Sequence, residues 1–250
     1  MPTASLNTAP SDPGTRAGRP DADTQPLVMA IDTTTPVARL ALVTNGEPLA
    51  RLADDSGTPH SQTLFPNLDR LLTEAGADIS AIDIFAAVTG PGSFTGLRVG
   101  LAALRGLAHT LGRPGIGVTT IDATALAAGA AGLVIVALEA TRGEIFCGAR
   151  LLELHGADLI PRSLWRDCSV LPEAALAELA PLYADQPALV IGSAAARMRK
   201  LWAVPAWQFD TAPVETTIHV ARYAARLFRD GQTPPLDACY IRPADATLKS

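Results

Sequence analysis

The residues whose types and spacing could do chemistry are concentrated between Gly90 and Gly100, where the chain reads GPGSFTGLRVG. The segment follows an apolar run and precedes a helical pattern, a place where backbone N–H groups at a helix N-terminus can hold an anion. It lacks the Gly-Lys pair of a P-loop, and Thr95 stands where the dinucleotide pattern GxGxxG needs its third glycine. The nucleophile elbow GxSxG fails because no glycine lies two places before Ser93. Ser93 is therefore predicted to cap the helix rather than to act as a nucleophile.

Histidines and cysteines are spaced in a way that disfavours a metal site or a disulfide framework. Two histidines four positions apart would share one helix face and could bind a metal together. The four histidines are His60, His109, His155 and His219, and none lie four apart. The three cysteines, Cys147, Cys168 and Cys239, are odd in number and form no CxxC pair. We expect buried or incidental thiols and no bound metal.

Two acidic residues stand at the ends of short apolar runs. Asp32 follows residues 27–31, and Glu139 follows residues 133–138. Each acid is followed by a turn and a second apolar run, which suggests two copies of one α/β unit. In such a pair, Asp32, Thr33 and Glu139 are candidates for relics of a nucleotide site between the copies. The alternative is that the acids only end strands and hold no ligand, and the repeat itself could arise by chance.

The elements that position these residues alternate between strands and helices. The hydrophobic pattern predicts strands at 27–31, 37–43, 47–53, 82–88, 115–118, 133–138, 144–152 and 188–192. The first three form an antiparallel meander, with Asn45-Gly46 as a tight turn. Helices are predicted at 60–75, 95–111, 122–131, 172–185 and 217–230. Pro66 either starts the first helix or kinks it.

The helix over 95–111 is apolar around most of its circumference. One side, with Gly96 and Gly100, is small enough to let another backbone approach closely. A second side carries Leu97, Leu101, Leu104, Ala108 and Leu111, and a narrow polar side includes Arg98 and Arg105. A helix of this kind must be buried on more than one side, so either this chain or a partner chain covers the second apolar side. The last predicted helix carries three arginines on one side, which we interpret as a solvent-exposed face: Arg222, Arg226 and Arg229.

Composition is that of a globular protein. Hydrophobic residues make up 48% of the 250 residues and charged residues 18%, which excludes a largely disordered chain. The net charge of −5 does not indicate a nucleic-acid-binding protein, although it does not exclude a local basic patch. The longest apolar run, 125–138, is too short to span a membrane, and the N-terminus lacks a secretory signal. Residues 1–26 hold five prolines and are predicted to be a disordered tail. A cytoplasmic setting fits this composition.

The Gly90–Gly100 segment and the Ala/Gly-rich helix after it resemble the hallmark of the TsaB family. The motif loop consists of Gly90, Pro91, Gly92, Ser93, Phe94, Thr95 and Gly96. Further resemblances lie in order along residues 27–242: Ala30-Ile-Asp-Thr33, His60-Ser-Gln62 with Pro66, Glu139-Ala-Thr-Arg-Gly-Glu144 and Tyr240-Ile-Arg242. Two positions depart from the family pattern. The family's Asp-Ala-Arg is Glu139-Ala140-Thr141 here, and Ala238 replaces a proline, so a nucleotide role for the second lobe is in doubt.

The resemblance implies an α/β chain with the two-lobed actin-like (ASKHA, ribonuclease H-like) fold, each lobe a mixed sheet flanked by helices. The N-terminal lobe would span 27–115 and the C-terminal lobe 116–250. Family members are non-catalytic partners of TsaD, a paralogue that transfers a threonylcarbamoyl group to the adenosine next to the tRNA anticodon, with TsaE in a larger complex. The resemblance implies no cofactor bound by this chain alone, ATP or ADP at the complex interface, and only indirect contact with tRNA.

The resemblance also places the TsaD interface on the helices 60–75 and 95–111, packed as four helices. The expected contact residues are His60, Leu64, Leu68, Leu97, Arg98, Leu101, Leu104, Arg105 and Ala108. TsaD carries an HxxxH metal pair that the histidine spacing here does not provide. The rival interpretations are a stand-alone actin-like ATPase or protease-like hydrolase, and a homodimeric scaffold that uses the same helices.

Overall fold

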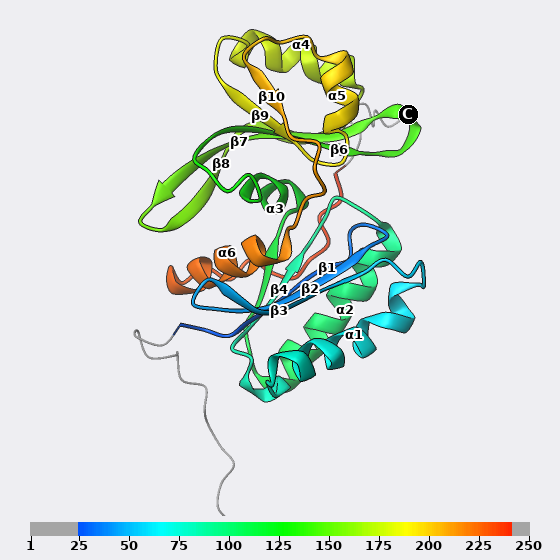
Figure 1. Cartoon of the computed structure of the whole chain (residues 1–250), viewed down its shortest axis with the longest axis vertical. Coiled ribbons are helices and arrows are strands. Elements are labelled where there is room, and N and C mark those ends of the chain that lie inside the picture. Colours follow the sequence, from blue (N-terminus) through cyan, green and yellow to red (C-terminus); the bar gives the residue numbers. More distant parts are fainter. Residues whose placement is uncertain (1–24, 242–250) are drawn as a thin grey trace, which may run out of the picture.

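The computed structural model describes residues 25–241 and places them in two lobes, each built on a five-stranded mixed sheet (Figure 1). The predicted N-terminal tail lies almost wholly outside the described residues. The first sheet has the strand order β3 (Glu47–Asp54), β2 (Ala38–Thr44), β1 (Val28–Asp32), β4 (Ile84–Val88) and β5 (Gly115–Val118). Its β1, β2 and β3 form an antiparallel meander, whereas β4 and β5 run parallel to β1.

The second sheet repeats this order and these directions. Its strands are β8 (Asp158–Val170), β7 (Ile145–His155), β6 (Gly132–Glu139), β9 (Ala188–Ile191) and β10 (Trp207–Phe209). Again the first three in sequence are antiparallel, and the last two run parallel to β6. Two sheets with one topology confirm the predicted duplicated α/β unit. The arrangement is the actin-like fold expected from the sequence.

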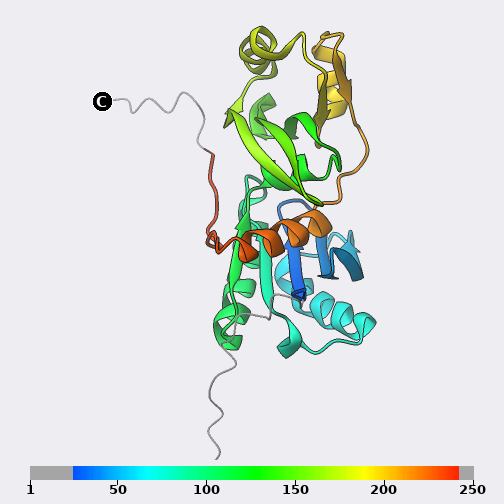
Figure 2. The ribbon, with the colours of Figure 1, turned by 90° about the vertical axis from the view of Figure 1, so that its left-hand side faces the viewer.

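Helices cover both faces of the first sheet. α1 (His60–Ala75) and α2 (Phe94–Leu111) pack on one face, and α6 (Thr217–Arg229) packs on the opposite face, toward the second lobe (Figures 1 and 2). α3 (Thr120–Leu126) lies on the inner face of the second sheet, and α4 (Pro172–Tyr183) and α5 (Ala195–Leu201) lie on its outer face. Two short 3-10 turns, η1 (Ile79–Ala81) and η2 (Thr141–Gly143), complete the elements. β5 and α6 thus belong with the first sheet, although the sequence assigned residues from 116 onward to the second lobe.

Local signals in the sequence set the predicted turns and caps. Asn45 and Gly46 adopt φ angles of 53° and 73° in the β2–β3 turn, as the tight hairpin requires. Gly76 and Gly112 end α1 and α2 in the left-handed conformation. Pro66 lies inside α1, which begins at His60, so the alternative that this proline starts the helix is wrong.

Five elements were not predicted: the strands β8 and β10, the helix α5, and the 3-10 turns η1 and η2. α3 is also shorter than expected, since it ends at Leu126 rather than near residue 131. Among residues 25–241, no helix is long and apolar enough to cross a membrane.

Candidate functional site

The Gly90–Gly96 loop joins β4 to α2 and is held by bonds within the chain. The Ser93 N–H donates to the Thr34 carbonyl oxygen at 2.7 Å, and the Gly90 carbonyl oxygen accepts from the Thr120 N–H at 2.7 Å. Ser93 caps α2, because its hydroxyl oxygen accepts from the Gly96 N–H at 3.2 Å. The cap confirms the sequence prediction. The loop is therefore a packed strand-to-helix turn.

The small side of α2 lies against the turn that follows β1. The Thr33 hydroxyl donates to the Gly96 carbonyl oxygen at 2.8 Å. A methyl group on Gly96 would overlap the Thr33 carbonyl oxygen, and one on Gly100 would overlap the Thr33 hydroxyl. The close backbone approach predicted for these glycines is thus made by the chain's own β1–β2 turn.

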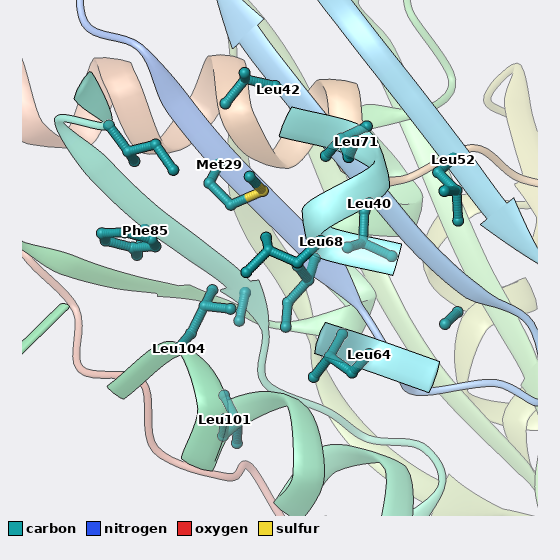
Figure 3. Packing of buried hydrophobic residues seen from close by; sticks show 14 of the residues in the cluster. Met29, Leu40, Leu42, Leu52, Leu64, Leu68, Leu71, Phe85, Leu101 and Leu104 are labelled. Atoms are coloured by element: carbon teal, nitrogen blue, oxygen red, sulfur yellow. The ribbon is translucent and has the colours of Figure 1, made fainter. Parts of the chain in front are cut away.

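The second apolar side of α2 is buried against the first sheet. Leu97 and Leu104 are each 1% exposed, and Leu101 is 5% exposed. They pack with side chains of α1 and of the strands in one core cluster, in which Leu104 lies closer to Phe85 than Leu101 does (Figure 3). The remaining apolar residues expected at the partner interface, Leu64, Leu68 and Ala108, belong to the same cluster. The expectation that these six side chains form the main partner contact is corrected, because the chain's own sheet covers most of their surface and leaves little of it for a partner.

What remains accessible is the side of the two helices that points away from the sheet. On α1 this side includes Phe65, which is 57% exposed, and Pro66. On α2 it includes Arg98, Ala102 and Gly106, all exposed. We call the surface formed by these five residues the outer face. α2 contains no acidic residue, so the charge it presents there is positive.

The remaining expected interface residues are His60 and Arg105. The His60 ring donates from Nε2 to the Thr35 carbonyl oxygen at 2.9 Å, which ties the start of α1 to the β1–β2 turn. Arg105 is exposed on α2 and forms an ion pair with Asp237. Both polar residues therefore stay at the rim of the outer face.

A cluster of two aromatic rings and an arginine was not predicted from the sequence. The Phe94 ring lies 5.7 Å from the Tyr240 ring, and the Arg98 guanidinium carbon lies 3.7 Å from the centre of the Phe94 ring. The segment before Tyr240 is fastened to the first sheet, since the Cys239 N–H donates to the Thr89 carbonyl oxygen at 2.7 Å. The sequence had marked Tyr240 only as a resemblance to a family signature, and no local pattern links it to α2.

The actin-like fold implies a nucleotide site between the two lobes. A cleft of 390 Å³ lies between the two sheets, and Asp32, Thr120, Leu138 and Thr216 are among its lining residues. Asp32 accepts three hydrogen bonds within the chain: one carboxylate oxygen accepts from the Thr34 N–H at 2.9 Å and from its hydroxyl at 2.6 Å, and the other accepts from the Thr216 hydroxyl at 2.6 Å.

The other two candidates for nucleotide contact do not line this cleft. The Thr33 hydroxyl donates to the Gly96 carbonyl oxygen in α2, and Glu139 forms an ion pair with Arg197 at 3.3 Å. Of the described residues that line the cleft, Arg39 alone is positively charged. A nucleoside triphosphate held by this chain alone would therefore meet one cationic side chain and would depend on the backbone N–H and hydroxyl donors of this lining.

Sequence comparisons relate the chain to proteins named for tRNA threonylcarbamoyladenosine biosynthesis. A family model described as "TsaD: tRNA N6-adenosine threonylcarbamoyltransferase" matches residues 54–227. The tRNA threonylcarbamoyladenosine biosynthesis protein TsaB of Haemophilus influenzae is 30% identical over 161 residues, which cover 61% of this chain and 67% of that protein. Its namesake in Escherichia coli is 34% identical over 122 residues, covering 48% of this chain and 52% of that protein.

Two solved structures from Pseudomonas aeruginosa share the fold. One, described as YeaZ, has a TM-score of 0.73 and 23% identity, and it covers 86% of this chain and 100% of its own. The other, described as an uncharacterized protein with similarity to peptidase YEAZ, has a TM-score of 0.74 and 24% identity, and covers 87% of this chain and 100% of its own. Both fold similarities span the two lobes.

Proposed function

Because the chain belongs to the TsaB family, whose relatives named above are tRNA threonylcarbamoyladenosine biosynthesis proteins, we propose that it is the accessory subunit that pairs with TsaD. In this role it stabilises TsaD in a competent state, and TsaD performs the transfer to tRNA. TsaE joins the larger complex, and tRNA contacts this chain only indirectly.

The observation that carries the proposal is the outer face of α1 and α2. Two neighbouring helices present Phe65, Ala102 and Gly106 to solvent, together with Arg98. Small residues let a second pair of helices approach closely, while Phe and Arg are residue types that anchor protein interfaces. A helix pair of TsaD laid across this face would complete a four-helix arrangement.

The non-catalytic part of the proposal is supported by the cleft. Asp32, the acid at the end of β1, already accepts three hydrogen bonds from Thr34 and Thr216, which occupy most of the acceptor capacity that a metal or a nucleophilic water would need. The acid at the equivalent place in the second lobe, Glu139, is paired with Arg197. A stand-alone ATPase usually holds the phosphates with several cationic groups, whereas Arg39 is the single cationic side chain among the described residues of this lining.

The test uses two exposed helical alanines. Ala102→Glu places a charge on the outer face of α2, and Ala177→Glu places the same charge on α4 of the second lobe, where Ala177 is also exposed. Ala and Glu have similar helix propensities, so both variants should fold like the wild type. Because Ala102→Glu would place a longer side chain where the partner helices must approach closely, and would offset the positive charge of Arg98 four positions earlier, it should weaken binding to the cognate TsaD by about a hundredfold or more, whereas Ala177→Glu should leave it unchanged.

Titration calorimetry with purified TsaD measures both affinities, and sedimentation of the chain alone measures self-pairing. If the two variants bound TsaD with equal affinity, the interface would not include the outer face of α2. Failure of the wild type to bind TsaD at micromolar concentrations, or robust ATP turnover by the chain alone, would overturn the proposed function.

A further inference from the structure

A second cavity lies where α6 meets the turn between β7 and β8, apart from the outer face and the interlobe cleft. Its volume is 280 Å³, and it is closed on a third side by the loop after α3. Three polar side chains, His219, Arg222 and Tyr223, enter it from α6 at positions i, i+3 and i+4, which places them on one helix face. We propose that this cavity is a binding site for a small organic carboxylate, a carboxyl group on a short aliphatic or aromatic body.

The polar wall has unused hydrogen-bonding capacity. Within residues 25–241, neither the His219 ring nor the Tyr223 hydroxyl takes part in a hydrogen bond. Arg222 donates from Nε to the Gly46 carbonyl oxygen at 2.5 Å and makes a long contact of 3.4 Å from Nη2 to exposed Glu47, so Nη1 keeps its donors. Three donors that converge on one small space suit the two oxygens of a carboxylate.

The charge balance of the wall favours a single negative charge. Asp158, the acid among the described lining residues, already accepts from Arg229 at 2.7 Å and from Arg226 at 3.4 Å. Its charge is offset by these two arginines, and Arg222, whose carboxylate contact is the 3.4 Å approach to exposed Glu47, contributes positive charge to the wall. Burial and the neighbouring Arg222 lower the pKa of His219, so its ring is neutral at pH 7 and adds a hydrogen bond but no charge. Burial raises the pKa of Tyr223, which keeps its hydroxyl protonated as a donor.

The opposite wall is apolar. Leu126 and Leu159 line it with alanines of the loop after α3, and Leu154 stands at its edge with 62% of its surface exposed. An organic body in the cavity would cover part of Leu154, which gains roughly 25 cal/mol for each Å² of apolar surface removed from water. Sites for small molecules usually measure about 300–1,000 Å³, so this cavity suits a ligand at the small end of that range.

The test titrates the full chain with benzoate, with the neutral isostere benzamide, and with inorganic phosphate, by ligand-observed NMR. Benzoate should bind saturably at the millimolar level or tighter, and benzamide should bind about tenfold more weakly, because it lacks the charge that pairs with Arg222. No saturable binding of benzoate, or equal binding of benzamide, would overturn the proposal. Tighter binding of phosphate than of benzoate would overturn the carboxylate assignment.

Three variants locate the site. Arg222→Gln should weaken benzoate binding about tenfold, and Tyr223→Phe, which removes only a hydroxyl, should weaken it severalfold. Arg199→Gln, at an exposed arginine on α5, should leave the affinity unchanged. Circular dichroism confirms that each variant is folded. Wild-type affinity in both Arg222→Gln and Tyr223→Phe would place the benzoate elsewhere and refute the site.

Discussion

Replacing Gly96 with alanine tests whether α2 is held by the β1–β2 turn. The new methyl group would point at the Thr33 carbonyl oxygen, a backbone atom that cannot swing aside like a side chain. The turn or the helix must shift, and the 2.8 Å hydrogen bond from the Thr33 hydroxyl to the residue-96 carbonyl oxygen would be strained. Gly106 lies on the same helix with nothing within 4 Å of the corresponding position, which makes Gly106→Ala a matched control.

The two substitutions should change stability in opposite directions. Overpacking a close contact costs about 1–3 kcal/mol, and a strained buried hydrogen bond adds up to about 1 kcal/mol. The better helix propensity of alanine offsets about 1 kcal/mol of this cost, so Gly96→Ala should be less stable than the wild type by up to about 3 kcal/mol. At exposed Gly106 only the propensity gain remains, so Gly106→Ala should be more stable by about 0.5–1 kcal/mol.

Urea denaturation followed by circular dichroism measures both free energies of unfolding. The midpoint should fall for Gly96→Ala and rise for Gly106→Ala, with an unchanged slope in each case. If Gly96→Ala proved as stable as the wild type while Gly106→Ala gained stability as expected, the close packing of α2 on Thr33 would be refuted.

Two further predictions concern the buried charges of the second lobe and the histidine of α6. Arg150 is 4% exposed and forms ion pairs with Asp122 at 2.6 Å and Asp167 at 2.7 Å, so Arg150→Ala should cost about 3–5 kcal/mol by thermal or urea unfolding, because two carboxylates lose their partner. The pKa of His219 is lowered by burial, so the unfolded chain binds the proton more readily and stability should fall as the pH drops below about 6.5. His219→Gln should reduce that fall between pH 7 and pH 5, and an unchanged pH dependence would contradict the assignment.

Local chemistry made much of the first lobe predictable. Asn45-Gly46 demands a tight turn wherever it lies between two alternating strands, and the glycines after α1 and α2 end those helices by their own backbone preference. Ser93 caps α2 because its hydroxyl reaches an N–H only three residues away. Each of these features depends on neighbours within a few positions, and so it can be read from a short stretch of sequence.

Features that depend on distant contacts were not predictable in the same way. β8 contains Pro161 and lies at the edge of its sheet, where one side needs no partner strand and the hydrophobic alternation is weak. The hydrophobic pattern predicted the apolar side of α6. It cannot show which of the two sheets this side covers, and in the structure α6 packs on the first sheet. Tyr240 packs against Phe94, and the two residues are too far apart in the sequence for a periodic pattern to predict the contact.

The correction at α2 changes what a partner would meet. The helix has two apolar sides, and the chain uses both, since the β1–β2 turn takes the glycine side and the first sheet takes the leucine side. The remaining exposed side carries the small residues Ala102 and Gly106 together with Arg98 and Arg105, and Phe94 is 52% exposed at the start of the helix. Apart from Phe94, α2 offers a partner no large exposed apolar side chain, so binding must rely on close helix approach, on the rings of Phe65 and Phe94 and on the positive charge. The affinity for TsaD should accordingly fall with rising salt, as it would not if an apolar leucine ridge formed the interface.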